Sequence, residues 1–386
     1  MFTAVWILAC LLYMTGIINY ESPSGEFLTV LFSLFSFFYF GYYITFFLES
    51  RKSNAFHANK KLFKDESKSI ELVFYFLLGL LAIRAISVAF GLYFRFGGVA
   101  AIFANGDLIY ELTRKGLWSP GIPVVLPVEM LSGFFTSYRF LKTGRFDKLS
   151  WLTIFFIILV TTLLQSRYML VMSFMALVSP IVGSLPKLRL LNIRRLLILI
   201  AIIVSITMSR ALTSRVYGGG DRFGSLAYAG ELASVVYYLS CGVAGLNEYI
   251  RLGVDEFSAS YTLNGLARVI ELVTFKEGLA MGFEEVTYLT PTPTIIASAF
   301  KFIIDDFGVF SPFVFGLLGA SVRFFYRSCR NDKSRLRLFI FSALYMTLGI
   351  SFFSWTFFIG GFWLYIISGT FLIFLTQTNF LRLIIK

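Results

Sequence analysis

IELVFYFLLGLLAIRAISVAFGLY, residues 70–93, is the stretch that decides the fold class of this chain. It contains only two charged side chains, Glu71 and Arg84, and no proline. A transmembrane helix needs about 20 predominantly apolar residues to cross roughly 30 Å of hydrocarbon. The stretch therefore predicts a membrane-spanning helix, with Arg84 inside the hydrocarbon region.

The rest of the chain has a similar composition. Of its 386 residues 57% are hydrophobic and 15% are charged. Because a soluble domain usually has about a quarter of its residues charged, this composition predicts an all-α membrane protein. The first apolar run has no basic segment before it and no small-residue cleavage site, which indicates a transmembrane helix and not a removable signal peptide. About ten segments can span: 3–20, 27–49, 70–93, 120–138, 149–165, 168–185, 196–209, 302–322, 338–358 and 361–378.

Lys and Arg are distributed unevenly between the two sides of these segments. Of the 34 basic residues 22 lie in five connecting segments: 51–68, 139–148, 187–195, 323–337 and 382–386. The alternate loops, with the outer ends of the spans, hold 11. Because basic loops stay in the cytoplasm, the pattern predicts that both termini are cytoplasmic. This bias also explains the net charge of +12, so no nucleic-acid partner is needed.

Two loops on the predicted outer side are long, and they cover 94–119 and 210–301. The second divides the chain into seven spans in 1–209, a large periplasmic loop in 210–301 and three spans in 302–386. Within that loop the apolar stretch 232–245 is short for a span. We therefore expect it to form an interfacial or re-entrant helix.

Four arginines lie on the predicted outer side, where the charge bias disfavours them. One is in the turn between the fifth and sixth spans and three follow the seventh span: Arg167, Arg210, Arg215 and Arg222. A guanidinium group binds two phosphate oxygens at once and stays charged at any relevant pH. Glycines at 218–220 add backbone N–H groups that an anion can approach closely. The pattern predicts phosphate binding, and ion pairing with outer acids such as Asp221 is the alternative.

Arg84 and Glu129 are charged residues inside predicted spans. Each lies about nine residues from the outer end of its span, so at a rise of ~1.5 Å per residue both lie at similar depth. A charge in the bilayer usually faces the interior of the bundle and has a partner. We expect the two residues to pair, either as a structural ion pair or so that Arg84 can orient the site or bind a lipid phosphate.

Acidic residues on the outer side are the candidate catalytic bases. Glu231 is the best placed, because it lies between the arginine segment and the apolar stretch 232–245, and Asp221 is a second candidate. No Asp-x-Asp pair occurs on the outer side, which argues against a metal-bridged sugar-nucleotide enzyme. The only histidine, His57, lies in a Lys-rich loop, and the cysteines lack CxxC spacing, so we expect no metal site.

Asp305 and Asp306 lie at the predicted outer mouth of the eighth span, after the proline-containing segment 290–294. Proline favours an extended segment there. Either acid can accept the proton of a sugar hydroxyl, or it can instead hold one of the loop arginines. Beyond them, Gly316 and Gly319 permit close contact between membrane helices.

These features together resemble the bacterial O-antigen (oligosaccharide repeat-unit) polymerases of the Wzy type. The resemblance covers nearly the whole chain as architecture: ten or more Phe-rich spans, both ends inside and one large outer loop late in the sequence. The local similarities are the Ser166-Arg167 turn, the Arg- and Gly-rich start of the large loop, the motif VVYYLSCGVAG, and Thr294 followed by Asp306-Phe307-Gly308.

The resemblance implies a GT-C-like helical bundle in the bacterial inner membrane. Such an enzyme transfers a growing glycan from undecaprenyl diphosphate to a second lipid-linked repeat unit, with inversion at the anomeric carbon and without a metal or other cofactor. A cation stabilises the diphosphate leaving group, and a carboxylate deprotonates or orients the acceptor hydroxyl. The implied partners are lipid-linked glycans, membrane lipid, a flippase and a chain-length regulator. The implied residues are Arg84, Arg167, Arg210, Arg215 and Arg222 for diphosphate, and Glu231, Asp221 or Asp306 for catalysis.

Several other functions stay open. A lipid-linked oligosaccharide flippase is also Phe-rich and polytopic, but it should have charged residues along a central cavity and no large outer loop. The related O-antigen ligases use a histidine on the outer loop, and this chain has none there. A membrane acyltransferase needs a histidine in or at the edge of the membrane, where His57 does not lie. A structural partner in an assembly complex is the non-enzymatic alternative.

Overall fold

The structure, a computed structural model, describes the helices of the chain and some of the residues between them. In this described part there are helices and no strand, so the predicted all-helical class is confirmed there. The described residues are 2–15, 20–50, 67–105, 126–164, 166–184, 231–253, 260–274, 298–332, 334–351 and 359–377, together with 108, 109, 112, 118, 120, 121 and 356.

Several helices are apolar enough for a membrane environment. The segments that are also long enough to cross are Gly25–Phe47, Ser69–Phe96 and Ala299–Cys329. Shorter apolar helices cover Lys148–Leu163, Tyr168–Ser184 and Gly360–Thr376. Of the ten predicted spans, 196–209 lies outside the described residues, and the number of helices that cross stays a prediction.

A proline-containing segment shortens the fourth predicted span. The sequence predicts a span over 120–138, but helix α6 covers Val128–Thr143. The helix begins directly after Pro127, because proline lacks an N–H group and clashes with the preceding turn inside a helix. It ends at Gly144, whose φ of 74° is the left-handed conformation that favours glycine.

The eighth predicted span, 302–322, is two helices instead of one. Helix α12 covers Ala299–Phe307, a short 3₁₀ turn follows, and α13 covers Ser311–Asp332. The chain breaks at Gly308, whose φ of 49° is accessible to glycine at little cost. Pro312 then lies in the first turn of α13, where its missing N–H group is tolerated.

The chain packs into two compact units, each assembled from three parts of the sequence. Unit 1 contains Met1–Phe56, Arg215–Phe325 and Thr347–Trp363. Unit 2 contains His57–Ser214, Tyr326–Met346 and Leu364–Lys386. The helices of unit 1 are α1 (Phe2–Met14), α2 (Gly25–Ser50), α10 (Glu231–Leu252), α11 (Ser260–Thr274), α12 and most of α13. The helices of unit 2 are α3 (Ser67–Phe96), α4 (Val99–Ala104), α6, α7 (Lys148–Leu163), α8 (Arg167–Ser184), most of α14 (Arg335–Gly349) and most of α15 (Gly360–Gln377).

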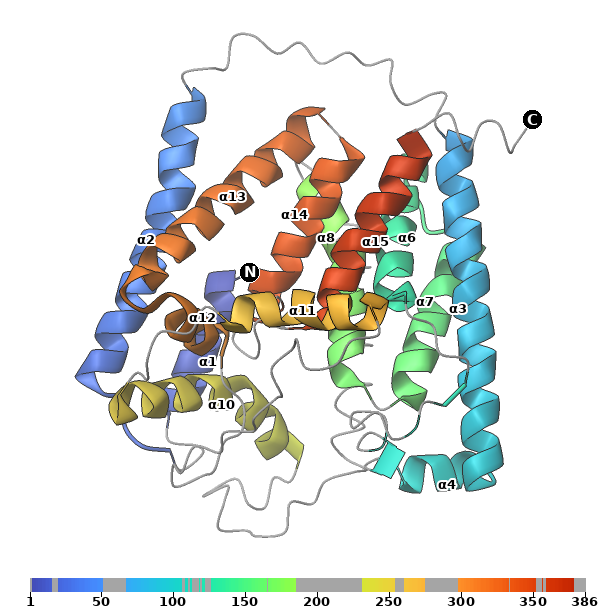
Figure 1. Cartoon of the computed structure of the whole chain (residues 1–386), viewed down its shortest axis with the longest axis horizontal. Coiled ribbons are helices and arrows are strands. Elements are labelled where there is room, and N and C mark those ends of the chain that lie inside the picture. The colour runs from blue at the N-terminus through green and yellow to red at the C-terminus, as the bar shows by residue number, and fades with distance from the viewer. Residues whose placement is uncertain are drawn as a thin grey trace. The chain divides into compact units, whose positions relative to one another are not determined.

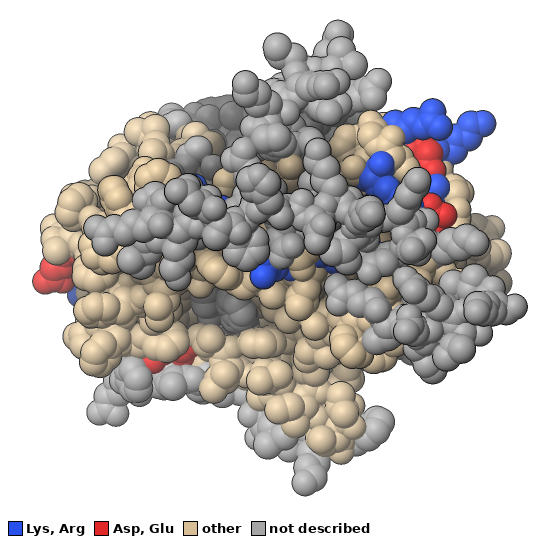
Figure 2. Space-filling model, turned by 90° about the horizontal axis from the view of Figure 1, so that it is seen from above, with Lys and Arg blue, Asp and Glu red and all other residues tan. Residues whose placement is uncertain are grey.

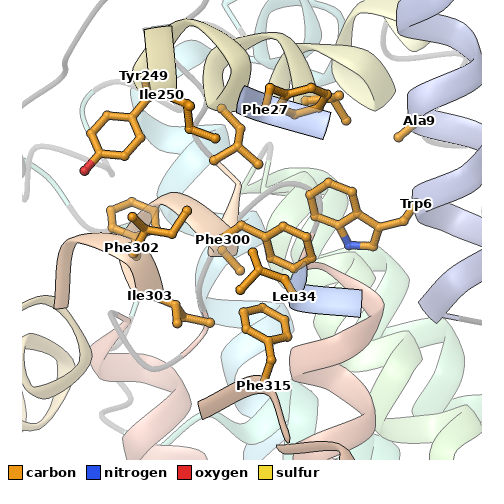
Figure 3. Close-up of a cluster of buried hydrophobic side chains, with 14 of the residues drawn as sticks. Trp6, Ala9, Phe27, Leu34, Tyr249, Ile250, Phe300, Phe302, Ile303 and Phe315 are labelled. Atoms are coloured by element: carbon orange, nitrogen blue, oxygen red, sulfur yellow. The ribbon is translucent and has the colours of Figure 1, made fainter. Parts of the chain in front are cut away.

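The core of unit 1 is aromatic (Figure 3). Trp6 of α1 stacks on Phe300 of α12, with ring centroids 4.0 Å apart and an interplanar angle of 7°. Phe315 of α13 meets the same Phe300 ring edge-on at 4.6 Å. The indole Nε1 of Trp6 donates to Ser351 Oγ at 2.9 Å, so its polar atom is satisfied inside the core. Stacked and edge-on rings thus join helices that are far apart in the sequence.

Glycines bring α2 and α13 into backbone contact, and in Figure 1 the two helices run obliquely to each other. A Cβ on Gly41 would lie 1.9 Å from the carbonyl oxygen of Gly316. A Cβ on Gly319 would lie 2.1 Å from the carbonyl oxygen of Phe38. No side chain fits at either position, so the predicted close contact at Gly316 and Gly319 is confirmed.

In unit 2, helix α3 presents one buried stripe at helical spacing. The stripe packs with residues of α6 and α7 and consists of Leu81, Ala85, Val88 and Leu92. Their spacing of three and four residues places them on a single face of the helix. The stretch that decides the fold class therefore also forms one side of a hydrophobic core.

The opposite face of α3 is apolar as well, but it is exposed. Ile83, Ile86 and Phe90 are each more than half exposed. On the face shown in Figure 2, most of the visible surface of the described residues is also uncharged. A helix that is apolar on both faces is typical of a chain surrounded by lipid on one side and protein on the other.

Candidate functional site

Arg84 and Glu129 form the ion pair that the sequence predicts. Arg84 Nε lies 2.6 Å from Glu129 Oε1, and the two side chains are 18% and 2% exposed. The position of Glu129 within its helix differs from the prediction, because the residue lies in the first turn of α6 and not near the middle of a helix over 120–138. The contact forms because α3 and α6 pack together.

The second carboxylate oxygen of Glu129 is buried and has no hydrogen-bond partner among the described residues. Because Glu129 lies in the first turn of α6, its negative charge faces the positive end of the helix dipole. A buried polar atom without a partner still costs free energy, on the order of 1–3 kcal/mol. Oε2 of Glu129 is therefore a candidate acceptor for a hydroxyl group or a water molecule.

Helices α6 and α8 run parallel and in close contact, which brings their N-terminal ends together. A Cβ on Gly133 would lie 2.6 Å from the carbonyl oxygen of Ser173. The Ser137 hydroxyl donates to the carbonyl oxygen of Leu177. These contacts are four residues apart on both helices, so one helical turn earlier Glu129 lies beside the first turn of α8.

The first turn of α8 contains the predicted Ser166-Arg167 turn. Ser166 caps the helix: the N–H of Met169 donates to Ser166 Oγ at 3.3 Å. Arg167 is the first residue of α8, and its side chain lies outside the described residues. The structure thus brings the backbone of Arg167 to the end of unit 2 that holds Arg84 and Glu129.

Further unpartnered polar atoms lie along the same two helices. The hydroxyl groups of Ser132 on α6 and of Tyr168 and Ser173 on α8 are buried, and none has a hydrogen-bond partner in the described part of the chain. Buried polar groups usually find partners, so these atoms are available to water or to a bound molecule. We call Arg84, Glu129, Ser132, Tyr168 and Ser173 the polar cluster. Sequence reasoning missed its hydroxyl residues, because serines in an apolar helix give no distinct signal.

Asp306, a predicted catalytic residue, is enclosed in unit 1. Its carboxylate accepts the backbone N–H groups of Tyr261 at 2.8 Å and Thr262 at 2.5 Å, and it also accepts the Thr262 hydroxyl. These donors lie in the first turn of α11, which begins at Ser260. A carboxylate at a helix N-terminus stabilises the helix, so this geometry favours the structural role for Asp306.

Asp305 belongs to a buried network that the sequence did not reveal. Lys301 Nζ donates to Asp305 Oδ2 at 2.7 Å, and the hydroxyl of Tyr249 on α10 donates to Oδ1. The Lys301 ammonium also lies over the Tyr249 ring, 4.8 Å from its centroid. Lys301 and Asp305 are spaced i,i+4 at the start of an apolar segment, and this spacing was the available signal. The loop arginines are not the described partners of either acid.

Glu231, the preferred catalytic base, is the first residue of α10, and its side chain lies outside the described residues. Every side chain of residues 240–250 in the same helix is buried. This part of the predicted interfacial or re-entrant stretch is therefore enclosed by protein and has no exposed face.

Helix α11 is more exposed than α10. Leu263, Ile270, Leu272 and Val273 are exposed apolar side chains, and Asn264 and Val269 are buried.

The remaining predicted site residues, Asp221, Arg210, Arg215 and Arg222, lie outside the described residues. Among the residues that are described, no group of three or more His, Cys, Asp or Glu side chains could hold a metal ion. Of the predicted site, the structure therefore brings together Arg84 and the start of α8 with Arg167, and it places Asp306 in the other unit.

The polar cluster contains a guanidinium group together with buried hydroxyl and carboxylate atoms that have no hydrogen-bond partner among the described residues. Glu129 and Tyr168 of the cluster lie in the first turns of two parallel helices, α6 and α8. This chemistry suits a ligand that carries both an anion and hydroxyl groups. The chain matches no protein-family model, no curated protein and no solved structure.

Proposed function

We propose that this chain polymerises undecaprenyl-diphosphate-linked oligosaccharide repeat units into O-antigen or a related surface polysaccharide. The reaction takes place at the periplasmic face of a bacterial inner membrane. The observation that carries the proposal is the meeting of Arg84, Glu129 and the start of α8 at one end of unit 2. Two arginines predicted to bind diphosphate belong to this end.

In the proposed reaction, an acceptor hydroxyl attacks the anomeric carbon of the donor glycan. The bond from that carbon to the diphosphate oxygen breaks, and negative charge develops on the diphosphate. A fixed cation at that position stabilises the transition state. Glu129 orients the guanidinium of Arg84 through the contact at Nε, so Arg84 is held ready for an oxyanion.

The acceptor hydroxyl must lose its proton to a carboxylate. Glu231 and Asp221 retain this proposed role, because both lie in the loop that carries Arg210, Arg215 and Arg222. Asp306 is the weakest candidate, since its carboxylate already accepts three hydrogen bonds from α11. Serine and tyrosine hydroxyls of the polar cluster are suited to bind sugar hydroxyls near the leaving group.

A deletion strain distinguishes this function from the alternatives. Lipopolysaccharide from such a strain, resolved on a gel, should show a ladder that collapses to a single repeat unit. Complete loss of the O-chain would instead indicate a flippase or a ligase. An unchanged ladder would show that the chain acts on another polymer or on none.

Arginine-to-lysine variants test the diphosphate site in the complemented strain. Lysine keeps the charge but lacks the planar fork that binds two oxygens, so Arg167→Lys, Arg210→Lys, Arg215→Lys and Arg222→Lys should shorten the polymer. Loss of one transition-state contact costs on the order of 3 kcal/mol, or about a hundredfold in rate. Protein abundance, measured alongside, should stay normal.

Arg95→Lys is the matched control, because Arg95 is an exposed arginine of α3 that stacks on Trp118 at 4.5 Å. It should support normal polymer. If lysine at all four outer positions also supports normal polymer at normal protein level, these arginines do not bind diphosphate.

A further inference from the structure

Arg323 of α13 lies over two aromatic rings of α2. Its guanidinium carbon is 5.2 Å from the centroid of Tyr42 and 5.0 Å from that of Phe46. Nη1 of Arg323 donates to the Tyr42 hydroxyl at 3.1 Å. Arg323 lies one helical turn beyond Gly319, so the glycine crossing of α2 and α13 holds the guanidinium against these rings.

The charge of Arg323 is not neutralised by the described part of the chain. None of the ion pairs there involves Arg323. Its Nε is buried and has no hydrogen-bond partner among the described residues. A guanidinium has five N–H donors, and the Tyr42 hydroxyl accepts from only one nitrogen. Arg323 therefore has donors for an anion that the described residues do not supply.

The surroundings of Arg323 are apolar and exposed. Large exposed side chains flank it in the sequence of both helices: Tyr43, Phe46, Phe47, Leu317 and Phe324. Such a surface needs a cover of lipid acyl chains or of other apolar groups. An arginine in that setting is stable when it reaches the phosphate level of the bilayer.

We propose that Arg323 and Tyr42 bind the phosphate group of a membrane phospholipid, whose acyl chains lie on the exposed apolar faces of α2 and α13. In the sequence, the basic segment 51–68 follows α2 and the basic segment 323–337 begins within α13, so the predicted location is the cytoplasmic leaflet. Tyr42 lies eight residues before the end of α2. Arg323 and Tyr42 belong to unit 1, whereas the polar cluster belongs to unit 2. Lipid binding at Arg323 therefore does not depend on the glycan chemistry proposed above.

The test uses the purified full-length chain in a neutral detergent. Its thermal unfolding midpoint is measured while phosphatidylglycerol, diacylglycerol or inorganic phosphate is added. Diacylglycerol carries the same acyl chains without the phosphate, and inorganic phosphate carries the anion without the chains. Phosphatidylglycerol alone should raise the midpoint of the wild type.

Variants then locate the site. Arg323→Leu should need about tenfold more phosphatidylglycerol for half of the shift, which corresponds to the loss of one charged hydrogen bond. Arg323→Lys should lie between it and the wild type, because lysine keeps the charge and loses the fork. Arg95→Leu, which removes an aromatic-stacked arginine in unit 2, should titrate as the wild type does.

Two outcomes overturn the proposal. One is a shift by diacylglycerol or by inorganic phosphate as large as that by phosphatidylglycerol, which would mean that chains or a free anion suffice. The other is unchanged phosphatidylglycerol titration in Arg323→Leu, or in Arg323→Lys if the leucine variant does not fold.

Discussion

At the scale of single residues, the pair of Arg84 and Glu129 joins α3 to α6 with little access to water. Arg84 lies within an apolar helix, and the carboxylate beside it lies at a helix N-terminus, where negative charge is favoured. Each charge in such a setting depends on the other, because water does not replace a lost partner. The pair is therefore both a structural link and a way to fix the guanidinium.

Removal of either partner should lower the amount of protein in the membrane. Arg84→Ala or Glu129→Ala leaves one buried charge unpaired, at a cost of roughly 3–5 kcal/mol. The exchange of Arg84→Glu with Glu129→Arg should recover part of the loss. Recovery should be incomplete, because arginine in the first turn of α6 opposes the helix dipole. Membrane levels measured by immunoblot test this, and an exchange no better than the single variants would contradict the role of pairing.

The role of Asp306, structural or catalytic, can be decided by comparing the abundance of its variants with the polymer that they form. Asp306→Ala removes the acceptor for two N–H groups and one hydroxyl at the start of α11. The free energy of unfolding should fall by about 1–3 kcal/mol, and less folded protein should accumulate. Asp306→Asn keeps a carbonyl acceptor and should lose less. Polymer formed per molecule of folded protein should stay near that of the wild type. Normal abundance with no polymer would return Asp306 to the catalytic role.

At the scale of elements, helix crossings in both units depend on small residues. Gly41, Gly316 and Gly319 bring the backbones of α2 and α13 together, and Gly133 does the same for α6 and α8. Without water to drive association inside a membrane, helices gain stability from such close contact. The crossings also set the neighbours of charged residues, since Arg323 reaches Tyr42 only across the first crossing.

A methyl group at Gly41 should separate α2 from α13. Its Cβ would lie 1.9 Å from a backbone oxygen, so the helices must shift, at a cost of about 1–3 kcal/mol or more. Gly79→Ala is the matched control, because a Cβ at Gly79 of α3 would have nothing within 4 Å. Gly41→Ala should lower the unfolding midpoint in detergent and Gly79→Ala should not. Equal midpoints would mean that the α2–α13 contact carries little stability.

At the scale of the whole molecule, the uneven distribution of basic residues predicts which loops face the cytoplasm. Reporter fusions after Lys61, Lys148, Arg194 and Arg330 should give cytoplasmic signals. A fusion after Glu256 should give a periplasmic signal, because Glu256 belongs to the predicted outer loop 210–301 and α10 is not expected to cross the membrane. Periplasmic activity at Arg330 would overturn this topology, since it requires α10 to cross the membrane completely.

The sequence by itself determined the helical class, the apolar character and one pair of buried charges, Arg84 and Glu129. Runs such as 70–93 contain enough apolar residues for a membrane helix, and this is a local property that needs no knowledge of neighbours. It also predicted the partner of Arg84 and the glycines at which α13 makes close contact. Local signals failed at Pro127 and Gly308, where a hydropathy average does not register a change in backbone geometry.

Only the tertiary structure decided which distant residues meet. It placed Asp306 on the first turn of α11, Lys301 and Tyr249 on Asp305, and the starts of α6 and α8 side by side. These contacts depend on the directions in which helices cross and side chains project, and the apolar pattern of a lipid-exposed helix is nearly the same on every face. Hydropathy therefore says that such a helix is in the membrane, while packing decides which face meets which neighbour.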